Sequence, residues 1–228
     1  MEKAPAPLDI HLSYYQGLAP GEFFTWQFRK YRFGRIIPNF GQTVLDVGCG
    51  LGAETEYLRD HFGRRVAAVE ANGQALAVLK EKGIEAYPTL DAVDKEFDTV
   101  YAGHVIEHIS PGRIYEFVGK LVARVRPGGT LVIVSPVGKW FWDTPDHYRM
   151  YDRPAILSLF RVHGLQEIFY TYTGSQNVAC NVLRPVRRYL FSHEWSLALF
   201  YRLSKLSKRD LVIVGRKETN RVESEKAE

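Results

Sequence analysis

The chain has few cysteines and no long apolar run. Both absences restrict the cellular compartment in which we expect it. Its 228 residues contain two cysteines, Cys49 and Cys180, which cannot build a disulfide framework and do not form a CxxC pair. No run of about 18 apolar residues marks a membrane span. The first fifteen residues lack the apolar centre of a secretory signal. We therefore expect a reduced, cytoplasmic setting.

A strong charge of either sign is also missing. The formal net charge is +4 and the isoelectric point is about 9.0. The basic excess is local, because residues 184–217 hold nine Lys or Arg and only two acids. This mild imbalance does not indicate a nucleic-acid partner.

Apolar segments rich in β-branched residues alternate with helical patterns of 10–15 residues. Such alternation predicts parallel strands joined by right-handed crossovers, which form an open, doubly wound α/β sheet. In these sheets, ligands bind beyond the carboxyl ends of the strands. The predicted strands are 43–47, 65–71, 84–88, 97–103, 130–136, 165–173 and 210–217, and the helices are 53–62, 73–83, 111–125 and 153–164.

Three segments fall outside this pattern. We expect residues 1–40 to form a helical lid, 41–217 to form the domain, and the charged tail 218–228 to be disordered. The long link 174–209 precedes the last strand and is predicted to be a helical insertion. Its apolar stripe and basic flank, within 184–209, suit either contact with a membrane surface or a lipid-linked acceptor, or simple packing on its own domain.

The stretch TVLDVGCGLGAET, residues 43–55, joins the first strand to a glycine-rich loop. Glycine lets the backbone turn tightly and lets a ligand approach it. Two cofactor classes fit: a dinucleotide, or S-adenosylmethionine. Glu70, at the end of the second strand, can accept hydrogen bonds from ribose hydroxyls in both cases. Asp46 separates them, because a carboxylate repels a pyrophosphate but can hold the cationic end of an amino acid.

Four motifs in order resemble the class I S-adenosylmethionine-dependent methyltransferases. They are VLDVGCGLG, VAAVEAN, FDTVYAGHVIEHI and VRPGGTLVIVSP, and the resemblance covers about residues 40–175. It implies a Rossmann-like, mostly parallel seven-stranded sheet with the last strand antiparallel and helices on both faces. It also implies S-adenosylmethionine as cofactor and S-adenosylhomocysteine as product.

The resemblance also implies roles for individual residues around the cofactor. Asp46 and the backbone near the loop glycines would face the methionine part, and Glu70 would bind the ribose. Asp91 would meet the adenine amino group, although it also reads as an ordinary loop acid. Tyr14 or Tyr15 would close over the cofactor, and Arg29 or Arg32 would meet its carboxylate. The full predicted cofactor set is Asp46, Gly48, Gly50, Glu70, Ala71, Asn72, Asp91, His104 and Tyr15.

The segment WFWDTPDHYRMYD, residues 140–152, is the predicted acceptor side. It resembles the DPTHVR segment of methyltransferases from surface-polysaccharide and natural-product clusters. His147 is the candidate general base, Asp146 would orient it or act directly, and His104 would lie near the methyl group. Arg149 would hold an acidic acceptor, and the aromatic residues 140–142 would wall the pocket. The alternative is a loop that only caps the next helix.

His104, Glu107 and His108 have the spacing of one helical face, which resembles a metal half-site. Because further acidic ligands are missing nearby, no metal is expected.

These observations favour a methyltransferase that acts on a small molecule or glycan. The candidate base His147 favours oxygen as the acceptor atom. Two alternatives remain open at this point. One is an NAD-dependent oxidoreductase, and the other is a non-catalytic domain that binds a cofactor or a protein partner.

Overall fold

The computed structural model describes residues 33–173 and 209–219. These residues form a seven-stranded sheet with the order β3-β2-β1-β4-β5-β7-β6. Strands β1 to β6 all run in the same direction, while β7, which lies between β5 and β6, runs antiparallel to both. The predicted doubly wound sheet with an antiparallel last strand is therefore confirmed.

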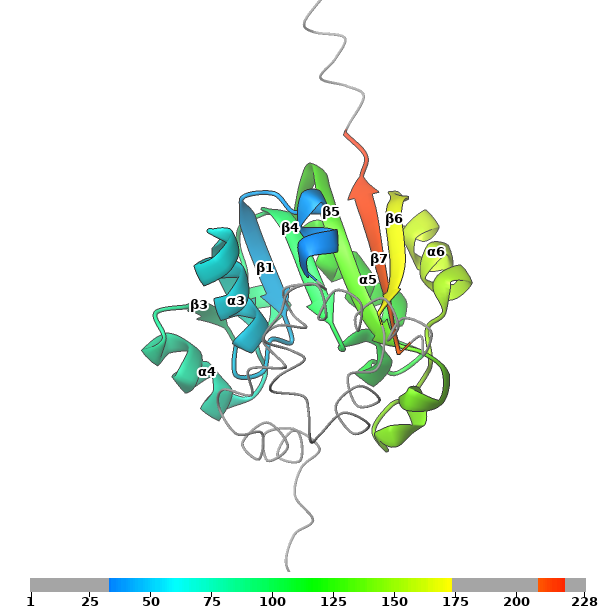
Figure 1. Cartoon of the computed structure of the whole chain (residues 1–228), viewed down its shortest axis with the longest axis horizontal. Coiled ribbons are helices and arrows are strands. Elements are labelled where there is room, and N and C mark those ends of the chain that lie inside the picture. Colours follow the sequence, from blue (N-terminus) through cyan, green and yellow to red (C-terminus); the bar gives the residue numbers. More distant parts are fainter. Residues whose placement is uncertain (1–32, 174–208, 220–228) are drawn as a thin grey trace, which may run out of the picture.

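The first half of the sheet grows outward from the centre. Strand β1 (Thr43–Val47) leads through the glycine loop into α3 (Ala53–Phe62) and returns as β2 (Arg65–Val69). Helix α4 (Gly73–Glu81) then leads to the edge strand β3 (Glu85–Tyr87). Every crossover brings the chain back parallel to β1, so the carboxyl ends of these strands meet at one edge of the sheet (Figure 1).

The second half grows in the other direction. The 3₁₀ turn η2 (Leu90–Ala92) precedes β4 (Phe97–Gly103), and η3 (Ile106–His108) follows it. Helix α5 (Ile114–Ala123) connects to β5 (Val125–Pro136), and η4 (Gly138–Asp143) leads to α6 (Arg153–Val162). Strands β6 (Leu165–Thr173) and β7 (Asp210–Lys217) finish the sheet.

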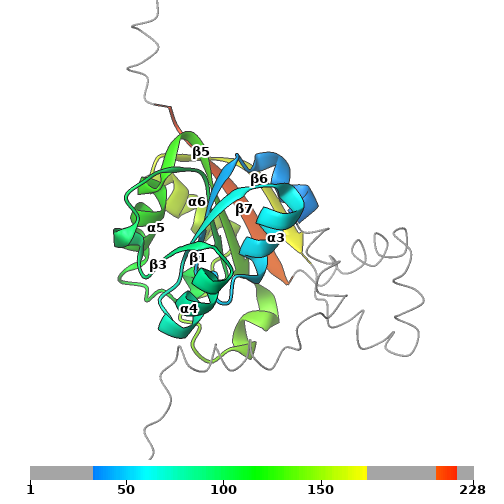
Figure 2. The ribbon, with the colours of Figure 1, turned by 90° about the vertical axis from the view of Figure 1, so that its left-hand side faces the viewer.

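Helices cover both faces of the sheet (Figure 2). The α5 and α6 side holds the larger apolar core, in which Val118 and Phe160 pack on Leu45, Ile133 and other strand residues. The other face is covered by α3 and by residues 33–40, which include the 3₁₀ turn η1 (Ile37–Asn39). Alternate residues of each central strand enter opposite cores, as expected for a sheet buried on both sides.

The predicted element bounds need correction at several places. The second strand ends at Val69, and the helices predicted as 73–83 and 153–164 end at Glu81 and Val162. Strand β5 begins at Val125 rather than at residue 130, because Val125 already pairs with Phe97 and the PGG segment continues the strand across a register shift. Helix α5 begins at Ile114 rather than at residue 111. The predicted lid 1–40 lies almost wholly outside the described residues. So do the insertion 174–209 and most of the tail 218–228, and those assignments remain predictions.

Candidate functional site

The glycine loop turns sharply at the carboxyl end of β1. Gly48, Gly50 and Gly52 all have positive φ, at 71°, 57° and 79°. The Gly48 N–H donates to the carbonyl of Val69 at 2.8 Å, which ties the loop to the end of β2. Positive φ strains residues with a side chain, so this path favours glycine at each of the three positions.

Two of these glycines also permit close packing beneath the loop. A Cβ added at Gly48 would lie 2.5 Å from Cγ2 of Val105, and one added at Gly52 would lie 2.5 Å from Cδ2 of Leu79. Both distances are far below van der Waals contact. The loop therefore rests directly on the segment after β4 and on α4, which fixes its height above the sheet edge.

Glu70 joins the loop to the second motif. Its side chain is 9% exposed, and its Oε2 accepts a hydrogen bond from the Gly50 N–H at 2.8 Å. Its Oε1 accepts from the Asn72 N–H at 2.9 Å. A carboxylate has about four lone-pair positions, so these two bonds leave acceptor capacity on both oxygens. The carboxylate thus shapes the cradle and can still accept hydrogen bonds from a ligand.

Asp46 is buried at the end of β1, with 2% exposure. Its Oδ2 accepts from the Thr55 hydroxyl at 2.6 Å, so the first turn of α3 holds the carboxylate in place. The neighbouring Cys49 is partly buried against the core. Burial, followed by the nearby Asp46 and Glu70 carboxylates, raises the pKa of the Cys49 thiol well above its usual range. This environment fits a small packing residue rather than a reactive thiolate.

Asn72 and Asp91 have structural partners of their own. The Asn72 side chain caps α4 by accepting from the Gln74 and Ala75 N–H groups at 2.9 and 3.0 Å. The Asp91 carboxylate lies 2.8 Å from Nζ of Lys120 on α5 and is exposed. The ordinary-acid interpretation accounts for this ion pair, and the adenine contact of Asp91 stays a prediction. Ala71, between these motifs, is exposed.

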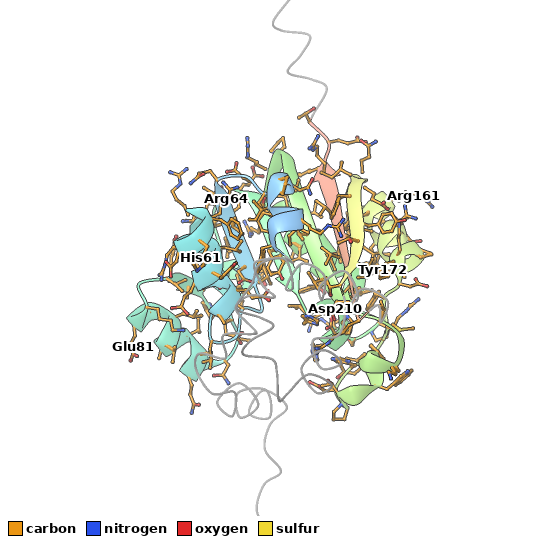
Figure 3. The ribbon with its side chains drawn as sticks, in the orientation of Figure 1. His61, Arg64, Glu81, Arg161, Tyr172 and Asp210 are labelled. Atoms are coloured by element: carbon orange, nitrogen blue, oxygen red, sulfur yellow. The ribbon has the colours of Figure 1, made fainter. Side chains whose placement is uncertain are left out.

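His104 follows β4 directly and has an unusual backbone. Its φ of 57° is the one positive value at a non-glycine residue among the described residues. Its Nδ1 lies 3.5 Å from Oε1 of Glu107, and its Nε2 lies 4.0 Å from Oδ1 of Asp210, where β7 begins. Figure 3 shows Asp210 at the same edge of the sheet as the strand ends. Strained backbone of this kind is concentrated at functional sites.

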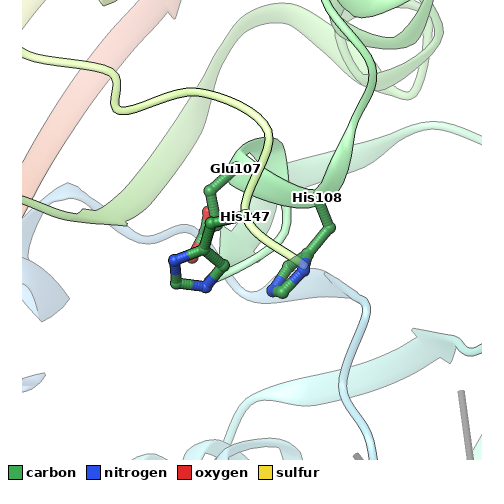
Figure 4. Close-up of side chains that lie close together, drawn as sticks. All are labelled: Glu107, His108 and His147. Carbon is green, nitrogen blue, oxygen red and sulfur yellow. The ribbon is translucent and has the colours of Figure 1, made fainter. Parts of the chain in front are cut away.

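The predicted helical face of His104, Glu107 and His108 is not formed. His104 lies in the turn before η3, and η3 is a single 3₁₀ turn, so the three residues do not share the geometry of an α-helix. Instead, Glu107 and His108 meet His147 from the segment after η4 (Figure 4). The rings of His108 and His147 have centroids 4.7 Å apart and planes 71° apart.

Residues around His147 fix its orientation. Its Nδ1 lies 2.6 Å from the carbonyl oxygen of Phe141, which can only accept, so Nδ1 carries the proton. Asp146 approaches His108 rather than His147, with 3.1 Å between Oδ2 and Nδ1 of His108. The printed contact of Asp146 is therefore with His108, and the expectation that Asp146 orients His147 stays a prediction. Sequence spacing could not reveal the contact, because His108 lies 38 positions away.

The aromatic residues after β5 divide between core and surface. Phe141 is 1% exposed and packs against His147, with centroids 4.9 Å apart, whereas Trp142 is 76% exposed. Arg149 lies over the ring of Tyr151, at 5.5 Å from the centroid. Tyr14, Tyr15, Arg29 and Arg32 lie outside the described residues, so their predicted contacts stay untested.

None of the helices in the described ranges has the length and apolar character that a membrane crossing requires.

Comparison with known proteins finds a family profile that matches part of the chain. The sequence profile described as "Methyltransferase domain" matches residues 45–133. That range holds the glycine loop, Glu70 and the Glu107–His108 turn. His147 lies beyond it.

The curated relatives include both N-methyltransferases and O-methyltransferases. Phosphoethanolamine N-methyltransferase 2 of Caenorhabditis elegans is 29% identical over 165 residues, which cover 68% of this chain and 36% of that protein. The chloroplastic tocopherol O-methyltransferase of Arabidopsis thaliana is 35% identical over 106 residues, covering 40% of this chain and 29% of that protein. The chain thus spans about a third of the length of the curated relatives it matches.

The fold recurs in solved structures. A SAM-dependent methyltransferase from Archaeoglobus fulgidus superposes with a TM-score of 0.63 at 20% identity, covering 84% of this chain and 94% of that one. At this identity the likeness concerns the fold.

Proposed function

Because the chain carries a domain of the class I S-adenosylmethionine-dependent methyltransferase family, we propose that it transfers a methyl group from S-adenosylmethionine to a small-molecule acceptor, at oxygen. The single observation that carries this proposal is the cradle at the carboxyl edge of β1 and β2. There, the Glu70 carboxylate binds both the Gly50 and Asn72 N–H groups, and Asp46 is buried beside the same loop. A diol and an ammonium group match these two carboxylates.

The reaction is an in-line displacement at the methyl carbon. The acceptor hydroxyl loses its proton, its oxygen bonds to the methyl carbon, and the C–S bond breaks with its electron pair left on sulfur. The products are S-adenosylhomocysteine and a methyl ether. A fixed sulfonium needs no activation from the protein, so the chain must position the acceptor and receive its proton.

The side chains after β4 and β5 support oxygen as the acceptor atom. His104, His108 and His147 gather at the edge where the methyl group would be presented, and the Nε2 of His147 keeps its lone pair because Nδ1 holds the proton. Such a basic cluster serves a hydroxyl, whereas an amine needs only to arrive neutral. A glycan or lipid-linked acceptor, contact of residues 184–209 with a membrane, and a cytoplasmic location remain proposals of the same kind.

The alternatives have less support. A dinucleotide would place its pyrophosphate at a loop that has Asp46 beneath it, and the matched family is one of methyltransferases. A purely non-catalytic domain would not need the His108–His147 cluster at the ligand edge.

Calorimetry with S-adenosylmethionine, S-adenosylhomocysteine and NAD tests the proposal. We expect the first two to bind and NAD not to bind. Replacing Glu70 with Gln should weaken binding more than tenfold, because an amide lacks the negative charge and one acceptor oxygen. Asp46→Asn should do the same. Glu81→Gln, on the exposed end of α4, is the matched control and should bind normally. Preference for NAD, or equal binding by all variants, would overturn the proposal.

A further inference from the structure

Two separate segments bring three metal-ligating side chains together. One ligand atom each from Glu107, His108 and His147 lie within 4.8 Å of one another. Glu107 and His108 come from η3 after β4, and His147 comes from the segment after η4 (Figure 4). Two imidazoles and one carboxylate are a donor set that binds zinc and related transition metals.

The Glu107 carboxylate is buried with one long ion-pair contact and no hydrogen bond from the described residues. The residue is 0% exposed, and neither carboxylate oxygen accepts a hydrogen bond from another residue of the described chain. The nearest basic group is Nδ1 of His104, 3.5 Å from Oε1. A buried ionised carboxylate without hydrogen bonds is costly unless a cation compensates it. The burial of this acid therefore points to a cation that binds beside it.

Both histidines have their Nδ1 side engaged by an acceptor. The Phe141 carbonyl lies 2.6 Å from Nδ1 of His147, and the Asp146 carboxylate lies 3.1 Å from Nδ1 of His108. Metal-ligating histidines commonly donate their second N–H to a carbonyl or carboxylate, which fixes the tautomer and raises the basicity of the ligating nitrogen. For His147, the proton on Nδ1 places the lone pair on Nε2, which is the nitrogen that a metal would take.

The two segments are fixed to each other by the backbone. The Tyr148 N–H donates to the carbonyl of Glu107 at 2.8 Å, one residue after His147. The ligand-bearing loops therefore cannot separate without losing this bond. Zinc–ligand bonds of about 2.0–2.1 Å bring ligand atoms to within about 3.5 Å. Small side-chain rotations close the remaining gap of roughly an ångström.

We propose that Glu107, His108 and His147 bind a divalent transition metal ion, of which Zn²⁺ is the representative, with Asp146 and the Phe141 carbonyl as outer partners. Two imidazoles disfavour Mg²⁺ and Ca²⁺, which take oxygen ligands. The ligand set differs from the His104, Glu107 and His108 spacing seen in the sequence, because His147 replaces His104.

For catalysis this inference rests on the proposed function. Three protein ligands leave coordination positions open, and a divalent ion lowers the pKa of a hydroxyl group that it contacts. With the ion bound, the Nε2 lone pair of His147 holds the metal instead of accepting the acceptor proton, and that proton passes to water. The metal site itself does not depend on the identity of the acceptor.

The test uses the tag-free 228-residue chain, treated with EDTA and then titrated with Co²⁺, a spectroscopic substitute for Zn²⁺. We expect a visible absorption band of a four- or five-coordinate ion, saturating at one equivalent and displaced by Zn²⁺ but not by Mg²⁺. His147→Ala and Glu107→Gln should each weaken Co²⁺ binding at least about 100-fold. Asp146→Ala should weaken it about 10–100-fold, as for loss of an outer partner.

His61→Ala is the matched control, since His61 lies on α3 against Tyr57, outside the cluster. It should bind Co²⁺ like the parent. The proposal is overturned if no such band forms, or if His147→Ala and Glu107→Gln bind Co²⁺ as well as His61→Ala does. Calorimetry with S-adenosylmethionine on the same EDTA-treated samples reports folding and cofactor binding, so failure of the metal site is distinguished from failure of the methyltransferase assignment.

Discussion

At the residue scale, Gly48 is favoured both by its backbone conformation and by the lack of space for a side chain. Its φ is 71°, and an added Cβ would lie 2.5 Å from Val105. Gly63, at the end of α3, has a similar φ of 59° but open space around it. Comparing Gly48 with Gly63 therefore separates the cost of backbone strain from the cost of steric conflict at the glycine loop.

Gly48→Ala should therefore destabilise more than Gly63→Ala. Backbone strain costs about 1–2 kcal/mol in both variants. The conflict with Val105 adds about 1–3 kcal/mol at Gly48 alone. Thermal denaturation measures both, and each kcal/mol corresponds to roughly 2–4 °C in Tm at this size. Adding Val105→Ala to Gly48→Ala should recover part of the loss; an unchanged or lower Tm in the double variant would contradict this packing.

At the element scale, helix starts are determined locally. Helix α6 begins after Asp152, whose Oδ1 accepts from the Ala155 N–H at 3.0 Å, and a proline stands in its first turn. The sequence predicted this helix, over residues 153–164, from its helical pattern. By contrast, the turn after β4 was predicted as part of a helical face and is a single 3₁₀ turn, because His104 adopts a left-handed backbone before it.

Loss of the Asp152 cap should lower stability without touching the cluster of Glu107, His108 and His147. We expect Asp152→Ala to reduce the free energy of unfolding by about 0.5–2 kcal/mol, because the Ala155 N–H loses its acceptor. Asp152→Asn keeps an acceptor oxygen and should lie within a few tenths of a kcal/mol of the parent. Urea denaturation distinguishes these values. Equal losses in both variants would show that the cap does not set this helix start.

At the scale of the whole molecule, β7 completes the sheet from far along the chain. It lies between β5 and β6, and its residues alternate between the two cores. Leu211 and Ile213 face the α5 and α6 side, while Val212 and Val214 face the α3 side, and all four are 0% exposed. Without this strand, β5 and β6 have no common partner.

A chain ending at residue 209 should therefore lose cooperative folding. We expect it to keep far-UV circular dichroism, lose near-UV signal and bind ANS, as compact states without fixed packing do. A chain ending at residue 219 keeps every described strand and is the matched control, with an expected Tm close to that of the full chain. A sharp, cooperative transition in the shorter chain would contradict the role given to β7.

The sequence alone determined the sheet, its chirality and the place of the ligand edge. Alternating apolar strands and helices restrict the topology, and the glycine loop with Asp46 and Glu70 marks the carboxyl end of β1 and β2 because these signals are local. The antiparallel last strand came from resemblance to a family rather than from the periodicity of the residues.

Only the tertiary structure decided which side chains meet across that edge. The pairing of Asp146 with His108, and the addition of His147 to Glu107 and His108, join residues 38 to 40 positions apart. The two segments that carry these residues follow β4 and β5. They are joined by the hydrogen bond from the Tyr148 N–H to the Glu107 carbonyl. Sequence spacing records neighbours on one element, whereas a site built from two loops depends on how the sheet places their ends.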